Sequence, residues 1–317
     1  MKKVLSVLLI VTLIFATVAL TACQSADYTI GVMQFANHDA LNKATEGFKQ
    51  RMNQWAEENG KTIRWDENNA SGVQSNASTI ASTLVAKNVD LIFANATPCA
   101  IAAANATESI PVLYTSVTNP EGEGLTTKDN VAGTSDLNPV AAQIQLMKDM
   151  VPDLDNIALL YCSNETNSKV QADLAKEKCE ELGITATEIT VAESNLIQST
   201  LQTRLTADID AVYIPTDNMM AENMGLIVNV TNEMQIPTIV GESGMVSSGG
   251  TATLSIDYFQ LGVQTAEIAI AVLEGNEVEK HQFYNRESQF TINEEGALAC
   301  GMTQSQIDAV KEKYAQQ

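Results

Sequence analysis

Short apolar runs rich in β-branched and aromatic residues alternate with longer amphipathic stretches from Tyr28 onward. The stretch ALNKATEGFKQRMNQWAEENG, for example, places Phe48, Met52 and Trp55 at helical spacing and ends at a glycine. Strand–helix alternation of this kind predicts an α/β protein with doubly wound parallel sheets. The predicted strands are YTIGVMQF, TIRWDE, DLIFANA, IPVLYTSV, NIALLYC, TATEITV, AVYIPT, IPTIVG and TATLSI.

The alternation occurs twice, which predicts two lobes. About four strand–helix units precede NVAGTSDLNP, and about four follow it up to SSGGTATLSID. Both of these stretches are expected to cross between lobes, and a third crossing near 285–293 returns the chain. We therefore predict two Rossmann-like lobes joined by a three-strand hinge, with a ligand in the groove between them. The expected N-lobe is 28–135 and 252–284, and the expected C-lobe is 136–251 and 285–317.

An export signal precedes this region. Two lysines follow Met1, the run Val4–Leu20 is apolar, and small residues lead to Cys23. The sequence Leu20-Thr21-Ala22-Cys23 resembles the lipobox of bacterial lipoproteins. That resemblance implies removal of 1–22, lipidation of Cys23 and a tether at 23–27, on the extracytoplasmic side of the cell membrane. A plain transmembrane anchor is the alternative, because the run is almost long enough to span a bilayer.

Charge and cysteine usage exclude several classes of protein. The net charge of −21 argues against nucleic-acid binding. The spacing of the remaining cysteines matches no zinc pattern, and their number is too small for a disulfide scaffold. Cys162 and Cys179 are expected at opposite edges of one strand–helix unit, so we do not pair them. The cysteines concerned are Cys99, Cys162, Cys179 and Cys300. No metal and no cofactor is predicted.

Polar residues gather where the predicted strands end. In open α/β sheets this edge binds ligands, and helix amino termini that attract anions also lie there. Helix capping explains part of this pattern, since Ser, Thr, Asn and Asp are preferred caps. The run SNETNS nevertheless holds more donors and acceptors than one cap can use, which favours a polar ligand cleft. The clusters are Gln34 with 37–39, 95–98, 115–119, 162–168, 216–218 and 242–244.

The positions of the charged residues limit the class of ligand that the cleft can bind. None of the four arginines lies in a strand-end cluster, which disfavours phosphate or dicarboxylate ligands. Hydroxyls and backbone N–H groups can instead hold one α-carboxylate. Asp217, or secondly Glu242, could pair with an ammonium group once water leaves. Four aromatic residues border the clusters and could pack a flat side chain, with an ordinary core position as the alternative. They are Phe35, Tyr114, Tyr161 and Tyr258.

Several of these motifs carry a family resemblance. The stretches GVMQFANHDALNKATEGF, IPVLYTSVTNPEGEGL, YCSNETNSKVQ, YIPTDNM and GESGMVSSGGTATLSIDYFQLGVQTA resemble ABC-transporter substrate-binding lipoproteins of the tryptophan/tyrosine-binding type, from Tyr28 to the end of the chain. The resemblance implies a type I periplasmic-binding-protein fold. It also implies closure on an amino acid, often aromatic, and delivery to an ABC permease with its ATPase.

The resemblance also implies the residues of the cleft. They are Gln34, His38, Thr97, Pro98, Ser116, Asn167, Ser168, Asp217, Asn218, Glu242 and Ser243. This chain departs from the family at two places. The first turn reads HDALN where the family often has His-Pro-Ala-Leu-Asp, and Met219 and Met220 stand where a smaller residue is expected.

Two other functions remain open at this stage. One is a ligand sensor that signals to a membrane kinase. The other is a hydrolase, although His38 and His281 are the only histidines, and the Gly-x-Ser-x-Gly elbow is absent from the sequence. A pair such as Asp217 with His38 stays open as a catalytic alternative. We expect a monomeric, non-enzymatic binding protein of an ABC importer that traps its ligand by closing two lobes.

Overall fold

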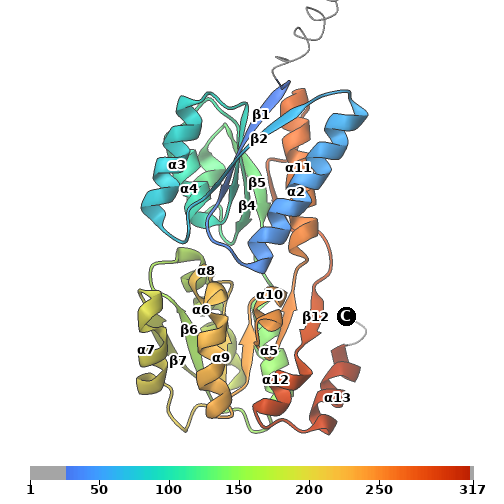
Figure 1. The fold of residues 1–317 in the computed structure, drawn as a ribbon. Helices are drawn as coiled ribbons and strands as arrows, with labels where there is room; N and C mark the ends of the chain where they lie inside the picture. Colours follow the sequence, from blue (N-terminus) through green and yellow to red (C-terminus); the bar gives the residue numbers. More distant parts are fainter. Residues whose placement is uncertain (1–25, 315–317) are drawn as a thin grey trace, which may run out of the picture.

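The computed structural model describes residues 26–314 and shows two lobes, one above the other in Figure 1. Each lobe contains a six-stranded sheet. The N-lobe sheet has the order β11-β5-β4-β3-β1-β2, and all its pairings are parallel. Its strands are β1 (Tyr28–Gln34), β2 (Ile63–Asn69), β3 (Leu91–Asn95), β4 (Val112–Val117), β5 (Val131–Ser135) and β11 (His281–Phe283).

The C-lobe sheet repeats this arrangement with the order β12-β10-β9-β8-β6-β7. Only its edge strand β12 is antiparallel, to β10. The strands are β6 (Asn156–Cys162), β7 (Thr185–Val191), β8 (Ala211–Ile214), β9 (Thr238–Val240), β10 (Ala252–Ser255) and β12 (Gln289–Ile292). Every predicted strand is therefore present, and the predicted α/β class with two doubly wound lobes is confirmed.

Helices cover both faces of each sheet. In the N-lobe, one face packs against α2 (Asp39–Glu58) and α11 (Tyr258–Glu274), and the other packs against α3 (Gln74–Ala86) and α4 (Thr97–Ala106). The C-lobe helices are α5 (Val140–Met150), α6 (Thr166–Leu182), α7 (Ile197–Arg204), α8 (Asn218–Glu222), α9 (Met224–Glu233), α10 (Ser243–Ser247), α12 (Glu294–Ala299) and α13 (Gln304–Tyr314).

The strand residues explain these layers. Ile30 and Val32 of β1 are buried with Phe48 of α2, whereas Met33 belongs to the core on the opposite face. Alternation along a strand sends successive side chains to opposite faces, so a strand covered on both sides is apolar nearly throughout. β3, with the sequence LIFAN, is buried at every position.

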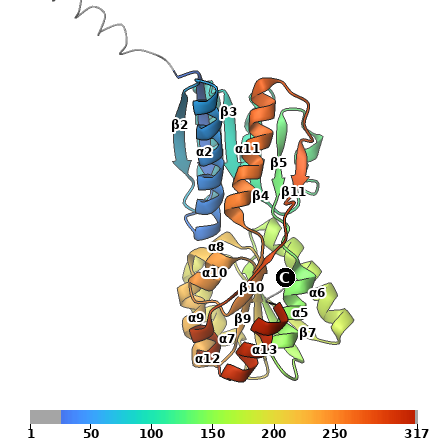
Figure 2. The same cartoon turned by 90° about the vertical axis from the view of Figure 1, so that its right-hand side faces the viewer.

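The helices α2 and α11 lie side by side, as both views show (Figures 1 and 2). Their backbones touch at two glycines. A Cβ on Gly47 would lie 2.0 Å from the carbonyl oxygen of Phe259, and a Cβ on Gly262 would lie 2.0 Å from that of Ala44. Only glycine permits this approach, so the sequence specifies a close helix pair from segments far apart in the chain.

Three segments cross between the lobes: 136–139, 256–257 and 284–288. Asn138 in the first crossing accepts a hydrogen bond from the backbone N–H of Ile256 in the second, at 3.0 Å. The three-strand hinge is thus present. The predicted N-lobe segment 252–284 begins too early, however. β10 hydrogen-bonds to β9 and β12 of the C-lobe sheet, so residues 252–255 belong to the C-lobe.

Other sequence expectations concern cysteines and the membrane. Within the described chain, Cys99, Cys162, Cys179 and Cys300 are all free and buried. Within residues 26–314, no three or more His, Cys, Asp or Glu side chains lie close enough together to hold a metal ion. No helix in that range combines the length and apolar character needed to cross a bilayer. The predicted signal at 1–22 and the lipidated Cys23 lie outside the described residues, as does most of the tether.

Candidate functional site

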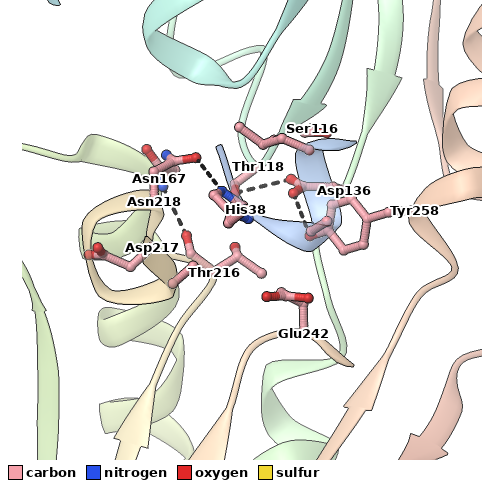
Figure 3. Close-up of a pocket in the computed structure, with 13 residues that line it drawn as sticks. His38, Ser116, Thr118, Asp136, Asn167, Thr216, Asp217, Asn218, Glu242 and Tyr258 are labelled. Atoms are coloured by element: carbon pink, nitrogen blue, oxygen red, sulfur yellow. Dashed lines mark hydrogen bonds between the residues drawn. The ribbon is translucent and has the colours of Figure 1, made fainter. Parts of the chain in front are cut away.

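A small cavity lies between the lobes at the carboxyl ends of the strands (Figure 3). We call it the inner cavity. The centre of a water molecule can occupy about 20 Å³ of it, which is room for about one water. Both lobes contribute side chains, and so does the first hinge crossing through Asp136. The lining residues are His38, Ala40, Leu41, Ser116, Thr118, Asp136, Asn167, Thr216, Asp217, Asn218, Ala221, Glu242 and Tyr258.

Direct hydrogen bonds hold the lobes together around this cavity. The ring nitrogen Nε2 of His38 lies 3.1 Å from Oδ1 of Asn218. The backbone N–H of Asn37 donates to the carboxylate of Glu222 at 2.8 Å. Each bond joins the loop after β1 in the N-lobe to α8 in the C-lobe. These contacts define a closed arrangement of the two lobes.

Three buried polar atoms on the cavity wall have no hydrogen-bond partner within the described chain. They are Oγ of Ser116, Nδ1 of His38 and Oδ1 of Asn167. An unsatisfied buried donor or acceptor costs about 1–3 kcal/mol, so native proteins rarely leave one without reason. Three around one cavity indicate a polar ligand. The hydroxyl of Thr97 is also buried and unpaired, but Thr97 does not line the cavity.

Ser116 lines the cavity and has an unfavourable backbone conformation. Ser116 has φ 55°, which is unfavourable for a residue with a side chain. The pairing of β4 with β5 shifts register between Tyr114 and Val117, on either side of this residue. Such a bulge redirects side chains and is common beside functional sites.

Asp217 and Glu242 prove to be helix caps. The carboxylate of Asp217 accepts from the backbone N–H groups of Met220 at 2.9 Å and Cys162 at 2.6 Å. The carboxylate of Glu242 accepts from the N–H groups of Gly244 and Met245. Both oxygens of each side chain are therefore committed to the backbone. Helix capping, the other explanation for polar residues at strand ends, therefore accounts for both residues, although both also line the cavity.

A third carboxylate, that of Glu165, lies beside Asp217. It accepts from the backbone N–H groups of Asn218 and Met219, both at 3.0 Å, and from the side-chain amide of Asn218 at 2.6 Å. Glu165 and Asp217 thus share the start of α8. Burial and the neighbouring charge of Glu165 raise the pKa of Asp217, and burial raises the pKa of Glu242.

Asp136 is the carboxylate that the sequence analysis missed. It follows β5 in the first crossing, is buried, and accepts hydrogen bonds from two hydroxyls. Tyr258 donates at 2.8 Å and Thr118 at 3.2 Å. No backbone N–H donates to its side chain among the described residues. Burial raises the pKa of Asp136. An acidic residue directly after a buried strand is the available signal, but the sequence analysis places NVAGTSD in a crossing and does not include Asp136 among the residues of the cleft.

The predicted residues divide into two groups. Those that line the inner cavity are His38, Ser116, Asn167, Asp217, Asn218 and Glu242. Ser168 is buried behind this wall, beside Asn167 and Asp217. The side-chain amide of Gln34 instead donates, inside the N-lobe, to the backbone carbonyl of Ala36 and to the side-chain oxygen of Asn42. Ser243 lines a surface groove next to the hinge, and Thr97 and Pro98 also lie outside the inner cavity.

Pro98 lines a second space between the lobes, which we call the outer chamber. The centre of a water molecule can occupy about 550 Å³ of it. Phe35 also lies there, whereas Tyr258 lines the inner cavity. Tyr114 and Tyr161 line neither space. The hydroxyl of Tyr114 is hydrogen-bonded to His281, and the hydroxyl of Tyr161 donates to Glu188. The outer chamber comprises Phe35, Ser71, Gly72, Val73, Gln74, Pro98, Cys162, Asn164, Glu165, Ala192, Glu193, Ser194, Met219, Glu222 and Asn223.

Comparison with known proteins agrees with this architecture. The family model described as "ABC transporter substrate binding protein" matches residues 29–312. A curated relative, the tyrosine-binding protein of Clostridioides difficile (strain R20291), is 33% identical over 332 residues. That alignment covers 98% of this chain and 95% of the relative.

Two solved structures are informative about the state of the lobes. The ABC domain from Streptococcus pneumonia in complex with L-Trp is 32% identical with a TM-score of 0.82, covering 89% of this chain and 98% of that one. The ligand-free, open structure of a substrate-binding protein with adhesive properties from Clostridium difficile is 34% identical. Its TM-score is 0.66, with coverage of 87% and 96%. The higher score with the ligand complex agrees with the closed lobes described above.

Proposed function

The chain belongs to the family of ABC transporter substrate-binding proteins, and from that premise we propose that it captures an α-amino acid, preferably aromatic, and delivers it to a membrane permease with its ATPase. One observation carries the ligand class. The small cavity is lined by residues with buried polar atoms that have no partner in the described chain, and by a buried carboxylate that accepts from two hydroxyls. A zwitterionic head group supplies both missing partners. The relatives named for tyrosine and bound to L-Trp support the aromatic preference.

The α-ammonium group is assigned to Asp136. A desolvated cation needs a carboxylate within the cavity. Asp217 and Glu242 each accept from two backbone N–H groups and each caps a helix start, whose partial positive charge offsets their own. Asp136 accepts instead from two neutral hydroxyls, so its charge lacks such a partner among the described residues. The hydroxyls of Tyr258 and Thr118 hold the Asp136 carboxylate in place while leaving lone pairs for the ammonium group. Oδ1 of Asn167 is a further unpaired acceptor on the same cavity.

The α-carboxylate is assigned to Ser116 and His38. The hydroxyl of Ser116 and Nδ1 of His38 are buried without partners within the described chain. The hydroxyl can donate to a carboxylate oxygen. Nδ1 can do so from the imidazolium form, because Nε2 already donates its hydrogen to Oδ1 of Asn218. His38 also meets Asn218 of the other lobe. A ligand held by His38 and Asp136 therefore contacts groups on the N-lobe and at the hinge at once.

Closure supplies the trapping step. The bonds from His38 to Asn218 and from Asn37 to Glu222 form only when the lobes approach each other. A ligand that adds contacts to both lobes shifts the equilibrium toward this closed state. Binding needs no bond-breaking chemistry, so we infer a transport function without catalysis. The imidazole of His38 pairs with the amide of Asn218 rather than with a nucleophile.

The lipid anchor is part of the proposal. The sequence at 20–23 supports acylation of Cys23, which would tether a monomer to the extracytoplasmic face of the cell membrane. From that position the protein could reach its permease without a spanning helix.

A ligand screen tests the function directly. The purified chain from Cys23 onward, with that cysteine replaced by serine, is heated with each proteinogenic amino acid and with sugars and purines as controls. We expect one or more amino acids, tyrosine or tryptophan foremost, to raise the melting temperature, because a ligand that binds only the folded state stabilises it. Calorimetry then confirms a single site. Stabilisation by a sugar or purine and by no amino acid would refute the proposal.

A further inference from the structure

The outer chamber adjoins the inner cavity and is far larger. The centre of a water molecule can occupy about 550 Å³ of the chamber but only about 20 Å³ of the inner cavity. Room for about one water does not accommodate an aromatic amino acid, and even its head group requires the inner cavity to widen on binding. If the head group occupies the inner cavity, its side chain must extend elsewhere. The adjoining space between the same two lobes is the chamber.

A hydrogen bond links the linings of the two spaces. Asn218 lines the inner cavity, and its amide donates at 2.6 Å to Glu165, which lines the chamber. Its Oδ1 lies 3.1 Å from Nε2 of His38 on the opposite lobe. The link between the two linings therefore includes a contact between the lobes. When the lobes separate the contact opens, and a ligand seated before closure can keep the two spaces joined.

The chamber walls suit a neutral ring. Phe35 and Pro98 of the N-lobe and Met219 of the C-lobe provide apolar surface from both sides. Aromatic and thioether groups both pack well on a ring. The chamber also contains the carboxylates of Glu193 and Glu222, and its lining residues include no lysine, arginine or histidine. An anionic side chain would therefore be repelled.

We propose that the outer chamber receives the ligand's side chain, and that Met219 and Phe35 set the preference among amino acids. This inference rests on the proposed function, because it assumes an amino-acid head group in the inner cavity. Met219 is one of the two methionines at which this chain departs from its family's pattern. Its side chain is half-buried at the chamber wall, whereas Met220 is fully buried in the C-lobe core.

Calorimetry on two variants of Met219 tests the proposal. Met219→Trp adds bulk to the chamber wall where the ring is expected to pack, so tyrosine and tryptophan should bind about tenfold or more weakly. Alanine, which carries only a methyl group beyond the head group, should keep its wild-type affinity. Met219→Ala widens the chamber and should shift the ratio of tyrosine to tryptophan affinity toward the larger ring. Leu226→Trp adds the same bulk on α9, outside both spaces, and should change nothing.

The outcomes separate the two proposals. If the wild-type protein binds no amino acid, the proposed function itself is wrong. If it binds tyrosine and Met219→Trp binds tyrosine equally well, the side chain does not enter the chamber. Equal loss of alanine and tyrosine in a folded Met219→Trp protein would assign Met219 to closure and overturn the inference. Circular dichroism checks that each variant folds. If Met219→Trp does not fold, Met219→Ala is sufficient as a test, because an unchanged ratio of tyrosine to tryptophan affinity in that variant would overturn the inference.

Discussion

The hydroxyl of Tyr258 donates a hydrogen bond of 2.8 Å to the carboxylate of Asp136, and the two residues lie at different crossings of the hinge. Asn138 reinforces this link, since its amide donates to the same hydroxyl at 3.2 Å. The carboxylate assigned to the ligand's ammonium group therefore lies in a segment that joins the two lobes. Ligand recognition and the hinge share one hydrogen-bond network.

Replacing Asp136 tests its role as the ammonium partner. Asp136→Asn keeps the shape of the side chain and removes its charge, so a desolvated ammonium group loses its counter-ion. We expect calorimetry to show amino-acid affinity lowered about tenfold to a hundredfold, the range for hydrogen bonds to charged groups. Tyr258→Phe, which removes only the supporting hydroxyl, should cost less. An unchanged affinity in Asp136→Asn would place the ammonium group elsewhere.

Asp217 is expected to contribute mainly to stability. Asp217→Ala removes two hydrogen bonds to backbone N–H groups at the start of α8 and at Cys162. The loss of a cap and of buried partners predicts a free energy of unfolding lower by about 1–3 kcal/mol. Urea denaturation measures this change, with the exposed Glu277→Ala as a control expected near wild type. If Asp217→Ala had wild-type stability but no longer bound amino acids, Asp217 would be a ligand-binding residue and not mainly a stabilising one.

The buried carboxyls predict opposite pH dependences for stability and binding. Burial raises the pKa values of Asp136, Asp217 and Glu242 in the folded protein. Their contribution to stability is therefore fully present below the ordinary carboxyl pKa, 3.8 for aspartate, and is lost as the pH rises through the raised folded values. A bound ammonium group favours the ionised carboxylates, so affinity should instead increase with pH over this range.

Calorimetry can detect the protons involved. Binding at about pH 6 should release protons, because the ligand lowers carboxyl pKa values that burial had raised. Titrations in two buffers with different ionisation enthalpies quantify that release. Proton uptake on binding, or affinity that falls with rising pH, would contradict the assignment of a cation to this cavity.

The lipid anchor predicts a change of fractionation. Cys23→Ser removes the thiol that would carry the lipid, and the protein should move from the membrane fraction to the soluble extracytoplasmic fraction. Ser25→Ala in the adjacent tether is a matched control that should remain with the membrane. If Cys23→Ser still sediments with membranes, another segment holds it there.

Sequence patterns predicted most of the fold, because each element carries its own signal. β3 is apolar throughout since both faces of the sheet are covered, and α2 shows its buried residues at helical spacing. The boundary at 252–255 was misplaced for a physical reason. The strand TATLS can pair with either sheet, and its choice depends on the distant strand β12 at 289–292, which local composition does not reveal.

The site was harder to predict because the same residue types cap helices and bind ligands. Asp217 occupies a strand end that faces the cavity, yet both of its oxygens serve the backbone. Asp136 shows no such ambiguity in the structure, but its position depends on a hydroxyl more than a hundred residues away along the chain. The separation of the inner cavity from the outer chamber likewise requires two lobes in contact.

The close pairing of α2 with α11 has a consequence for how the molecule is made. The N-lobe cannot complete the burial of its first long helix until residues 258–274 have been synthesised, and its edge strand β11 follows later still. An N-terminal fragment would lack Ala266, Ile268 and Ala269, which complete the core around Phe48 and Met52. The polypeptide therefore remains incompletely folded until almost its whole length is available, a condition that suits the export proposed for it.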